Sequence, residues 1–329
     1  MQRFEVDCNV RRHANSWERI LNLLDDFVDF LAKQWSESPD SLHPLDIPDI
    51  ERMIAPVGVP TGCTYRPWHW YPITSHACWK AWKTGGQGTC SLELQRSARD
   101  STWWCASLEE ASQHYSWTRS PHGTFVSLSA ELRVAMKASN VQVAASVCHR
   151  ILDWGGVARR ADNASRHWIN DQESAGSLIR ALGCAVSHLQ PQAARLSRFD
   201  FNGIDLPMNS ATTKIFAAAD SSNATLIFDG RVGAALCLLV RRFLETRPSP
   251  MLVPLELLFY WGPHATKQAL RNPSTPQFSF RDINQVTSLA RAQASQRANI
   301  VAQRLHAKTG VAPDNLERAL FMVGYSVNA

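Results

Sequence analysis

The segment LPMNSATTKIFAAADSSNATLIFDGRVGAAL, residues 206–236, carries a lysine and an aspartate at the edges of two apolar runs. Lys214 precedes the run IFAAA, and Asp229 lies fifteen residues further on, directly before GRVGAALCLLV. The amine of a lysine can act as a nucleophile, and a fixed carboxylate stabilises a cation that develops beside it. We therefore take Lys214 and Asp229 as candidate catalytic residues.

Both residues also have a purely structural interpretation. Aspartate is a preferred N-cap of α-helices, so we expect Asp229 to begin the helix that the following apolar run predicts. Lys214 is equally open to interpretation as a solvated surface residue. Capping does not exclude catalysis, because a helix N-terminus favours the ionised carboxylate that such chemistry needs.

The elements that must position this pair are mainly helical. From about residue 107 onward, apolar residues recur with helical spacing between glycines and prolines. The expected helices cover residues 129–138, 141–153, 172–188, 211–219, 230–246, 281–307 and 314–324, and an amphipathic helix at 15–36 precedes them. We expect a mainly α protein with a helical region at 107–329 and an aromatic N-terminal region at 1–106.

The N-terminal region is rich in tryptophan, with half of the twelve tryptophans lying between residues 68 and 104. GTCSLELQ and STWWCAS alternate like short strands, so this block forms either a small sheet or an irregular aromatic platform. Its aromatic residues either pack as a core or stack on unpaired bases. It also contains conceivable zinc ligands but no C-x-x-C pair, so we expect no metal there; these residues are Cys63, His69, His76, Cys78, Cys90 and Cys105.

The net charge of +5 hides an uneven distribution along the chain. Residues 1–60 contain six Lys and Arg against eleven Asp and Glu, whereas residues 230–310 contain eleven against three. A one-sided basic region is the electrostatic footprint of a protein that binds a polyanion. A well-solvated helical surface gives the same pattern, and charge alone does not separate the two interpretations.

Several classes of protein lack support in the sequence. The N-terminal residues MQRFEVDCNVRR show no secretory signal, and the apolar stretch MLVPLELLFYWG is too short and too polar to span a membrane. Eight cysteines without such a signal suggest reduced thiols and a cytoplasmic protein. The NTPase motif G-x-x-x-x-G-K-[ST], the serine-hydrolase motif G-x-S-x-G and the zinc motif H-E-x-x-H do not occur.

The stretch before Lys214 reads as helix, tight turn and helix over about residues 193–219. Gly203 and Pro207 bound the expected turn, and Ser210 or Thr212 is placed to cap the second helix. Such a turn directs backbone N–H groups toward an anion, for which a DNA phosphate is a suitable candidate. We expect this turn to be exposed.

The arrangement resembles the helix-hairpin-helix DNA glycosylases, most closely their 8-oxoguanine-glycosylase-like branch. The segments that carry the resemblance are ILDWGGV (151–157), MNSATTK (208–214), IFDGRVGAAL (227–236) and LFMVGY (320–325). They are similar to bacterial proteins of this fold, some of which excise hypermodified bases from phage DNA. The resemblance covers about residues 140–329. It implies that Lys214 attacks the sugar C1′ and that Asp229 assists, with modified double-stranded DNA as the partner and no cofactor.

Two departures from the family pattern affect these expectations. The family hairpin usually reads L-P-G-[VI]-G, whereas this chain has LPMNSA, so side chains of Asn209 and Ser210 are expected to replace amide contacts to phosphate. The cysteine quartet of the iron–sulfur members is absent, so we expect no cluster. The residues expected to contact DNA are Met208, Asn209, Ser210, Thr212, Thr213 and Arg231.

The resemblance also implies a pocket for an extruded base, with aromatic walls. Its expected wall residues are Trp154, Tyr260, Trp261 and Phe321, for which core packing is the alternative. The expected activity is cleavage of the N-glycosidic bond of a modified base, such as a glucosylated hydroxymethylcytosine of phage DNA. The alternatives are an 8-oxoguanine repair glycosylase with lyase activity, a non-catalytic reader of modified DNA, and a protein whose basic helices bind an acidic partner.

Overall fold

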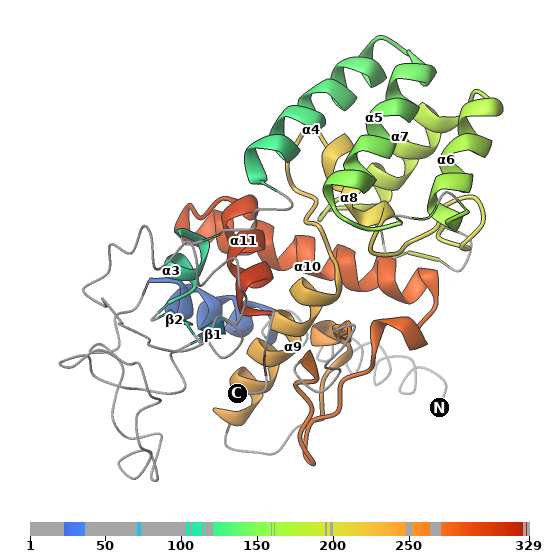
Figure 1. The fold of residues 1–329 in the computed structure, drawn as a ribbon. Coiled ribbons are helices and arrows are strands. Elements are labelled where there is room, and N and C mark those ends of the chain that lie inside the picture. The colour runs from blue at the N-terminus through green and yellow to red at the C-terminus, as the bar shows by residue number, and fades with distance from the viewer. Residues whose placement is uncertain are drawn as a thin grey trace, which may run out of the picture.

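The computed structural model describes residues 23–36, 71–73, 103–105, 107–113, 115, 121–158, 160, 162–194, 196–197, 200–247, 252–263, 271–324 and 327. Residues 23–36 are helical. The named elements are β1 (Tyr71–Ile73), β2 (Trp103–Cys105), α3 (Leu108–Gln113), α4 (His122–Lys137), α5 (Val141–Trp154), α6 (Ala164–Ser174), α7 (Leu178–Leu189), α8 (Thr212–Ala219), α9 (Gly230–Glu245), η4 (Leu255–Leu257), η6 (Ile283–Gln285), α10 (Ser288–Thr309) and α11 (Pro313–Val323). The mainly α class is confirmed (Figure 1).

The helices pack around two hydrophobic cores. Helices α4 to α8 form one body, with a core that includes Ile151 and Phe216. Helix 23–36, α3, α9 and α11 surround the second core, which includes Phe27. Helix α10 runs across the structure between these bodies (Figure 1) and contributes Ala292 to the first core and Val301 to the second. The chain crosses from the first body to the second between α8, which carries Lys214, and α9, which begins after Asp229.

The helix predicted at 172–188 is confirmed from Leu178 onward but wrong at its start, because the chain forms two helices there. Helix α6 ends at Ser174 and α7 begins at Leu178, with Gly176 between them at a φ of +66°. This left-handed conformation stops a helix and suits glycine. Helix α6 was missed because its sequence ASRHWINDQES has few apolar residues, although Trp168 and Ile169 are buried.

The tight hairpin predicted at 193–219 is also wrong in its first helix. Helix α7 ends at Leu189 and α8 begins at Thr212, and the described residues between them form turns and bends. The amide oxygen of Asn202 accepts hydrogen bonds from the N–H groups of Ile204 and Asp205, which holds a local turn in place of a helix. The apolar side chains of Phe201 and Leu206 anchor this loop, since both are buried in the first core.

The N-terminal region is described only in part. Strands β1 and β2 pair antiparallel, with Pro72 opposite Trp104, and β2 lies within the predicted strand STWWCAS. The segment GTCSLELQ and the zinc ligands suggested at residues 63–90 lie outside the described residues, as does the boundary expected after residue 106. In the part of the chain that the structure describes, no cluster of side chains suits a metal ion, and no helix has the length and apolar character to cross a membrane.

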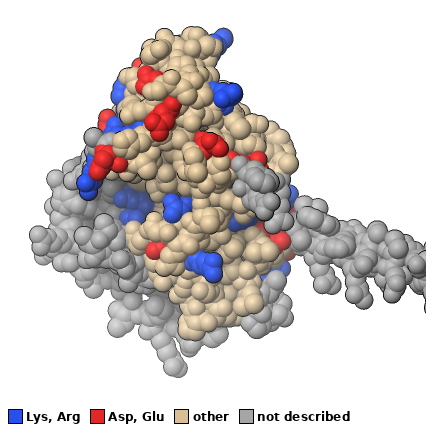
Figure 2. Space-filling model, turned by 90° about the vertical axis from the view of Figure 1, so that its right-hand side faces the viewer, with Lys and Arg blue, Asp and Glu red and all other residues tan. Residues whose placement is uncertain are grey.

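The basic region 230–310 meets the acidic N-terminal helix within the fold. The guanidinium groups of Arg304 and Arg247 lie 2.6 Å from the carboxylates of Asp25 and Asp26, and Lys308 pairs with Asp29. Lys and Arg still predominate on the lower half of the face in Figure 2. The uneven charge therefore has a structural explanation at these positions and does not by itself indicate a polyanion surface.

Candidate active site

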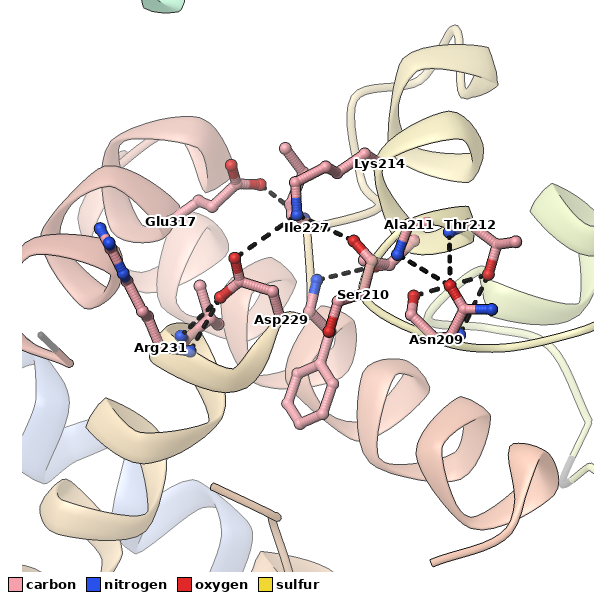
Figure 3. Close-up of polar contacts among 12 residues, drawn as sticks. Asn209, Ser210, Ala211, Thr212, Lys214, Ile227, Asp229, Arg231 and Glu317 are labelled. Carbon is pink, nitrogen blue, oxygen red and sulfur yellow. Dashed lines mark hydrogen bonds and ion pairs between the residues drawn. The ribbon is translucent and has the colours of Figure 1, made fainter. Parts of the chain in front are cut away.

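Asp229 is the N-cap of α9, as expected from the sequence. Its Oδ1 accepts hydrogen bonds from the N–H groups of Arg231 at 2.9 Å and Val232 at 3.2 Å. These bonds satisfy donors that the first turn of a helix leaves free. Its Oδ2 lies 3.5 Å from Nζ of Lys214 (Figure 3), so the cap also holds one carboxylate oxygen in front of the lysine.

Close backbone contacts fix the start of α9. A Cβ on Gly230 would lie 2.6 Å from Cα of Gly262, and the Gly262 N–H donates to the carbonyl of Gly230 at 2.9 Å. A Cβ on Gly324 would lie 1.9 Å from the Arg231 carbonyl oxygen. No other residue type fits at these two glycines without moving backbone, so they set the position of Asp229.

The segment between α8 and α9 is held by side chains. The N–H groups of Leu226, Ile227 and Phe228 donate to Asn299, Glu317 and Thr213, respectively, at 2.9, 2.6 and 2.8 Å. These acceptors come from three helices, α10, α11 and α8. Buried backbone donors need such partners, so the segment has one favoured position between the two bodies. The segment thereby places Asp229 in the wall of a cavity.

Lys214 is buried, with 5% of its surface exposed, so its interpretation as a solvated surface residue is wrong. Its Nζ donates to the carbonyl of Ser210 at 2.9 Å as well as facing Asp229. The stem of the side chain lies against Gly155, where a Cβ would be 2.6 Å from Cδ of Lys214. A buried amine is costly without oxygen partners. The carbonyl of Ser210 and the carboxylate of Asp229 provide these partners and hold Nζ of Lys214 in place.

A cavity of about 480 Å³ lies where the two bodies meet. It is lined by Tyr115, His122, Phe125, Trp154, Gly155, Gly156, Val157, Ser210, Lys214, Ile227, Asp229, Gly230, Arg231, Val232, Gly262, Pro263, Arg271, Ile283, Asn284, Glu317, Arg318 and Phe321. Both candidate catalytic residues face it, together with Trp154, Ser210, Arg231 and Phe321 from the other predictions. Junctions between packed bodies are a common location for ligand sites.

The cavity has aromatic residues on both bodies. Phe125 and Trp154 stack with ring centroids 4.6 Å apart, and the indole N–H of Trp154 donates to the Pro121 carbonyl at 2.9 Å. On the other body, the guanidinium of Arg231 lies 4.3 Å above the ring of Phe321. Trp154 is therefore well placed as a flat wall, whereas one face of Phe321 is already occupied by a cation.

The carboxyl of Asp229 is held ionised. Burial alone would raise its pKa, but Lys214, Arg231 and the two N–H groups that it caps outweigh burial and hold the pKa below its ordinary value. Glu317 lies in the same cavity and behaves oppositely. Burial and, to a smaller extent, the charge of Asp229 raise the pKa of Glu317 to about 8, against the hydrogen bond from the Ile227 N–H and the charge of Lys214.

The structure corrects three of the predicted DNA contacts. The side chains of Met208, Thr212 and Thr213 are 3%, 0% and 1% exposed, so they cannot reach DNA in this conformation. The hydroxyl of Thr212 accepts from the Asn209 N–H at 3.0 Å and donates to the Pro207 carbonyl at 2.8 Å. The turn is therefore exposed only at residues 202–205, where Ile204 is 80% exposed, whereas residues 206–211 form a packed connection.

Asn209 and Ser210 are half-buried and serve the fold and the cavity. The amide oxygen of Asn209 accepts from the N–H groups of Ala211 and Thr212 at 2.8 and 3.1 Å, so Asn209 provides the capping expected of Ser210 or Thr212. The carbonyl of Ser210 holds Lys214. Arg231, the remaining predicted DNA contact, lines the cavity and covers Phe321.

Replacing Asn209 by Ala should lower the free energy of unfolding by about 1–2 kcal/mol, because two N–H groups at the start of α8 lose their acceptor. Asn209→Asp keeps an oxygen that accepts from both N–H groups and should cost much less. Denaturant unfolding of the two variants measures the difference. Equal stabilities would show that this cap contributes nothing to α8.

Two residues predicted for the base pocket lie outside the cavity. Tyr260 is 7% exposed and its carbonyl abuts α9, where a Cβ on Gly233 would lie 1.9 Å from the oxygen. The indole N–H of Trp261 donates to the Phe280 carbonyl at 2.9 Å. Both residues pack in or against the second core, which was the alternative interpretation of these aromatic residues.

The sequence alone did not identify Glu317, Arg318, Phe125 or Gly155 as cavity residues. Glu317 lies one helical turn before Phe321 on α11, beside the apolar positions Leu316 and Leu320. A carboxylate next to the buried face of a helix was a signal that could have found it. Gly155 could not be identified from the sequence, because its role is to leave room for the side chain of Lys214, which is distant in the sequence.

In comparisons with known proteins, no family model, curated protein or solved structure matches this chain.

Proposed function

We propose that this protein is a DNA glycosylase that extrudes a modified base and cleaves its N-glycosidic bond. One observation carries the proposal: Lys214 and Asp229, from different helices, face each other at 3.5 Å in a cavity with aromatic walls. A carboxylate held ionised in a partly enclosed site stabilises the cation that develops on the sugar as the bond breaks. An adjacent lysine can capture C1′ as a Schiff base once it loses a proton.

The cavity suits a single base. Its volume of about 480 Å³ lies within the range of small-ligand sites and leaves room for a substituent on a nucleobase. A base inside a duplex cannot reach such a site, so the nucleotide must be flipped out. The stacked pair Phe125 and Trp154 offers a flat wall for an extruded base.

The proposed substrate is a hypermodified cytosine of phage DNA, and 8-oxoguanine is the second candidate. Both come from the resemblance of residues 140–329 to helix-hairpin-helix glycosylases, and the room in the cavity favours the larger base. Such an enzyme would meet phage DNA in the cytoplasm. The cavity arginines, Arg231, Arg271 and Arg318, replace the buried residues Met208, Thr212 and Thr213 as proposed contacts to the flanking phosphates.

The proposal is tested on duplexes of one sequence that contain glucosylated hydroxymethylcytosine, 8-oxoguanine or only ordinary bases. After incubation, heat and alkali cleave strands wherever a base has been removed. We expect cleavage of the duplex with the glucosylated base, no cleavage of the ordinary duplex, and none by Asp229→Asn. If all three duplexes stay intact while the modified one is still bound, the protein is a reader of modified DNA and not an enzyme.

A further inference from the structure

The cavity contains a second carboxyl that the proposed chemistry does not yet use. Glu317 projects from α11, and its Oε2 accepts a hydrogen bond from the Ile227 N–H at 2.6 Å. Figure 3 shows Glu317, Lys214 and Asp229 converging from α11, α8 and the start of α9. Two carboxyls from separate helices thus share one cavity with an amine, and their environments push their pKa values in opposite directions.

Breaking a C1′–N bond requires a proton as well as a stabilised sugar cation. The bond electrons pass to the ring nitrogen of the base, and an anionic base is a poor leaving group unless an acid protonates it. Asp229 cannot supply this proton. Its Oδ1 accepts from two backbone N–H groups, its Oδ2 faces the amine of Lys214, and its pKa is lowered.

Two other titratable groups in the cavity are poor donors at neutral pH. Burial and the charge of Glu317 raise the pKa of Tyr115, so its phenol holds its proton tightly. Burial and the charge of Arg318 lower the pKa of His122, against the charge of Asp314, so its imidazole is largely neutral. Glu317 combines a proton that is present at neutral pH with an acid strength near that pH, which is what general acid catalysis needs.

We propose that Glu317 is a catalytic residue that protonates the leaving base, a role that rests on the proposed glycosylase function. As the C1′–N bond breaks, its electron pair moves to the base and the carboxyl proton of Glu317 transfers to the base. Asp229 stabilises the cation left at C1′. The nucleophile, water or the Lys214 amine, then forms a bond to C1′ and loses a proton, which returns to the Glu317 carboxylate. When water is the nucleophile, the products are the neutral base and a sugar with a hydroxyl group at C1′, and the enzyme is regenerated. When the Lys214 amine is the nucleophile, the neutral base leaves and the sugar stays bound to Nζ, so water must hydrolyse the resulting Schiff base, directly or after β-elimination, before the enzyme is regenerated.

The charges of Asp229, Lys214 and Asp314 act on Glu317, and other titratable groups lie on the elements packed around it. Asp229 and Arg231 face it from α9, Lys214 from α8 and Tyr115 from the residues after α3, while Asp314 and Arg318 flank it on α11 and His122 on α4 contacts Asp314. Because its folded pKa is raised, the proton is present below about pH 8 and is lost as the pH rises through that value. Asp229 stays ionised throughout this window. Base excision should therefore fall above about pH 8.

The test compares wild type, Glu317→Gln and the surface variant Glu131→Gln in single-turnover excision of the modified base between pH 6 and 10. Glutamine keeps an oxygen for the Ile227 N–H but cannot donate an acidic proton. We expect Glu317→Gln to lower the rate about 100-fold or more at pH 7 and to abolish the decline above pH 8. Glu131→Gln should match wild type, because Glu131 lies on the surface beside Arg150.

A purely structural role for Glu317 predicts different results. A Glu317→Gln protein with the wild-type rate and the wild-type pH profile would overturn the proton-donor role and leave the glycosylase intact. If Glu317→Gln does not fold, Glu317→Asp is tested instead, with the modified base and with bases that leave readily without protonation. The excision rate of the aspartate variant should still decline at high pH. Its loss of rate relative to wild type should be smaller for the bases that need no protonation. An undiminished defect, or a wild type that excises no base, overturns the role.

Discussion

Replacing Asp229 by Asn should reduce base excision by about 100- to 1,000-fold, because a preorganised charge beside the reacting centre is removed. The amide oxygen of asparagine still accepts from the N–H groups of Arg231 and Val232, so α9 should keep its cap. The loss of the charge facing Lys214 should lower the free energy of unfolding by about 1–3 kcal/mol. Single-turnover excision and denaturant unfolding measure the two effects on one preparation.

Asp282→Asn provides the matched control for this variant. Asp282 is also an N-cap, with its carboxylate accepting from the Asn284 N–H at 2.7 Å, but its side chain is not part of the cavity wall. We expect it to excise at the wild-type rate. Wild-type excision by Asp229→Asn would reduce Asp229 to a capping residue, whatever its distance from Lys214.

The second large effect concerns Lys214. Borohydride added during the reaction should trap a covalent adduct between wild-type protein and the modified duplex, because reduction fixes the Schiff base between Nζ and C1′. Lys214→Ala cannot form this bond, so its adduct should disappear. Gel electrophoresis of the protein with labelled DNA measures the trapped fraction, and the surface variant Lys137→Ala should give the wild-type amount.

A different outcome would assign the lysine a different role. If wild type excises the base but borohydride traps nothing, water is the nucleophile and Lys214 positions Asp229 through their contact at 3.5 Å. Trapping that persists in Lys214→Ala would place the nucleophile elsewhere in the chain and contradict our assignment.

The local features of the site were predictable from the sequence. Apolar spacing predicted α5, α8, α9 and α11 to within a few residues, because α5 and α11 bury one face on a core and α8 and most of α9 are apolar runs buried on all sides. Asp229 was identified as a helix cap because capping depends only on a side chain and the next few N–H groups. Its pairing with Lys214 was suggested by residue type and resemblance, and the structure places the two side chains in contact.

The remaining features depend on contacts between distant parts of the chain. Glu317 on α11 accepts a hydrogen bond from Ile227 in the segment before α9, and Gly155 at the end of α5 makes room for Lys214 on α8. Aromatic type alone did not separate Trp154, which lines the cavity, from Trp261, whose indole N–H is bound by the Phe280 carbonyl. The charge asymmetry could not separate its two interpretations for the same reason, because sequence counts do not reveal that Arg304 faces Asp25.

The most direct test of the proposed function is mass spectrometry of the small molecules released from DNA with glucosylated hydroxymethylcytosine. Wild-type protein should release the intact modified base in an amount equal to the abasic sites formed. Asp229→Asn should release almost none, and the ordinary duplex should yield no free base. Release of a whole nucleoside or nucleotide, or of the base at equal rates by wild type and Asp229→Asn, would contradict N-glycosidic cleavage in this cavity.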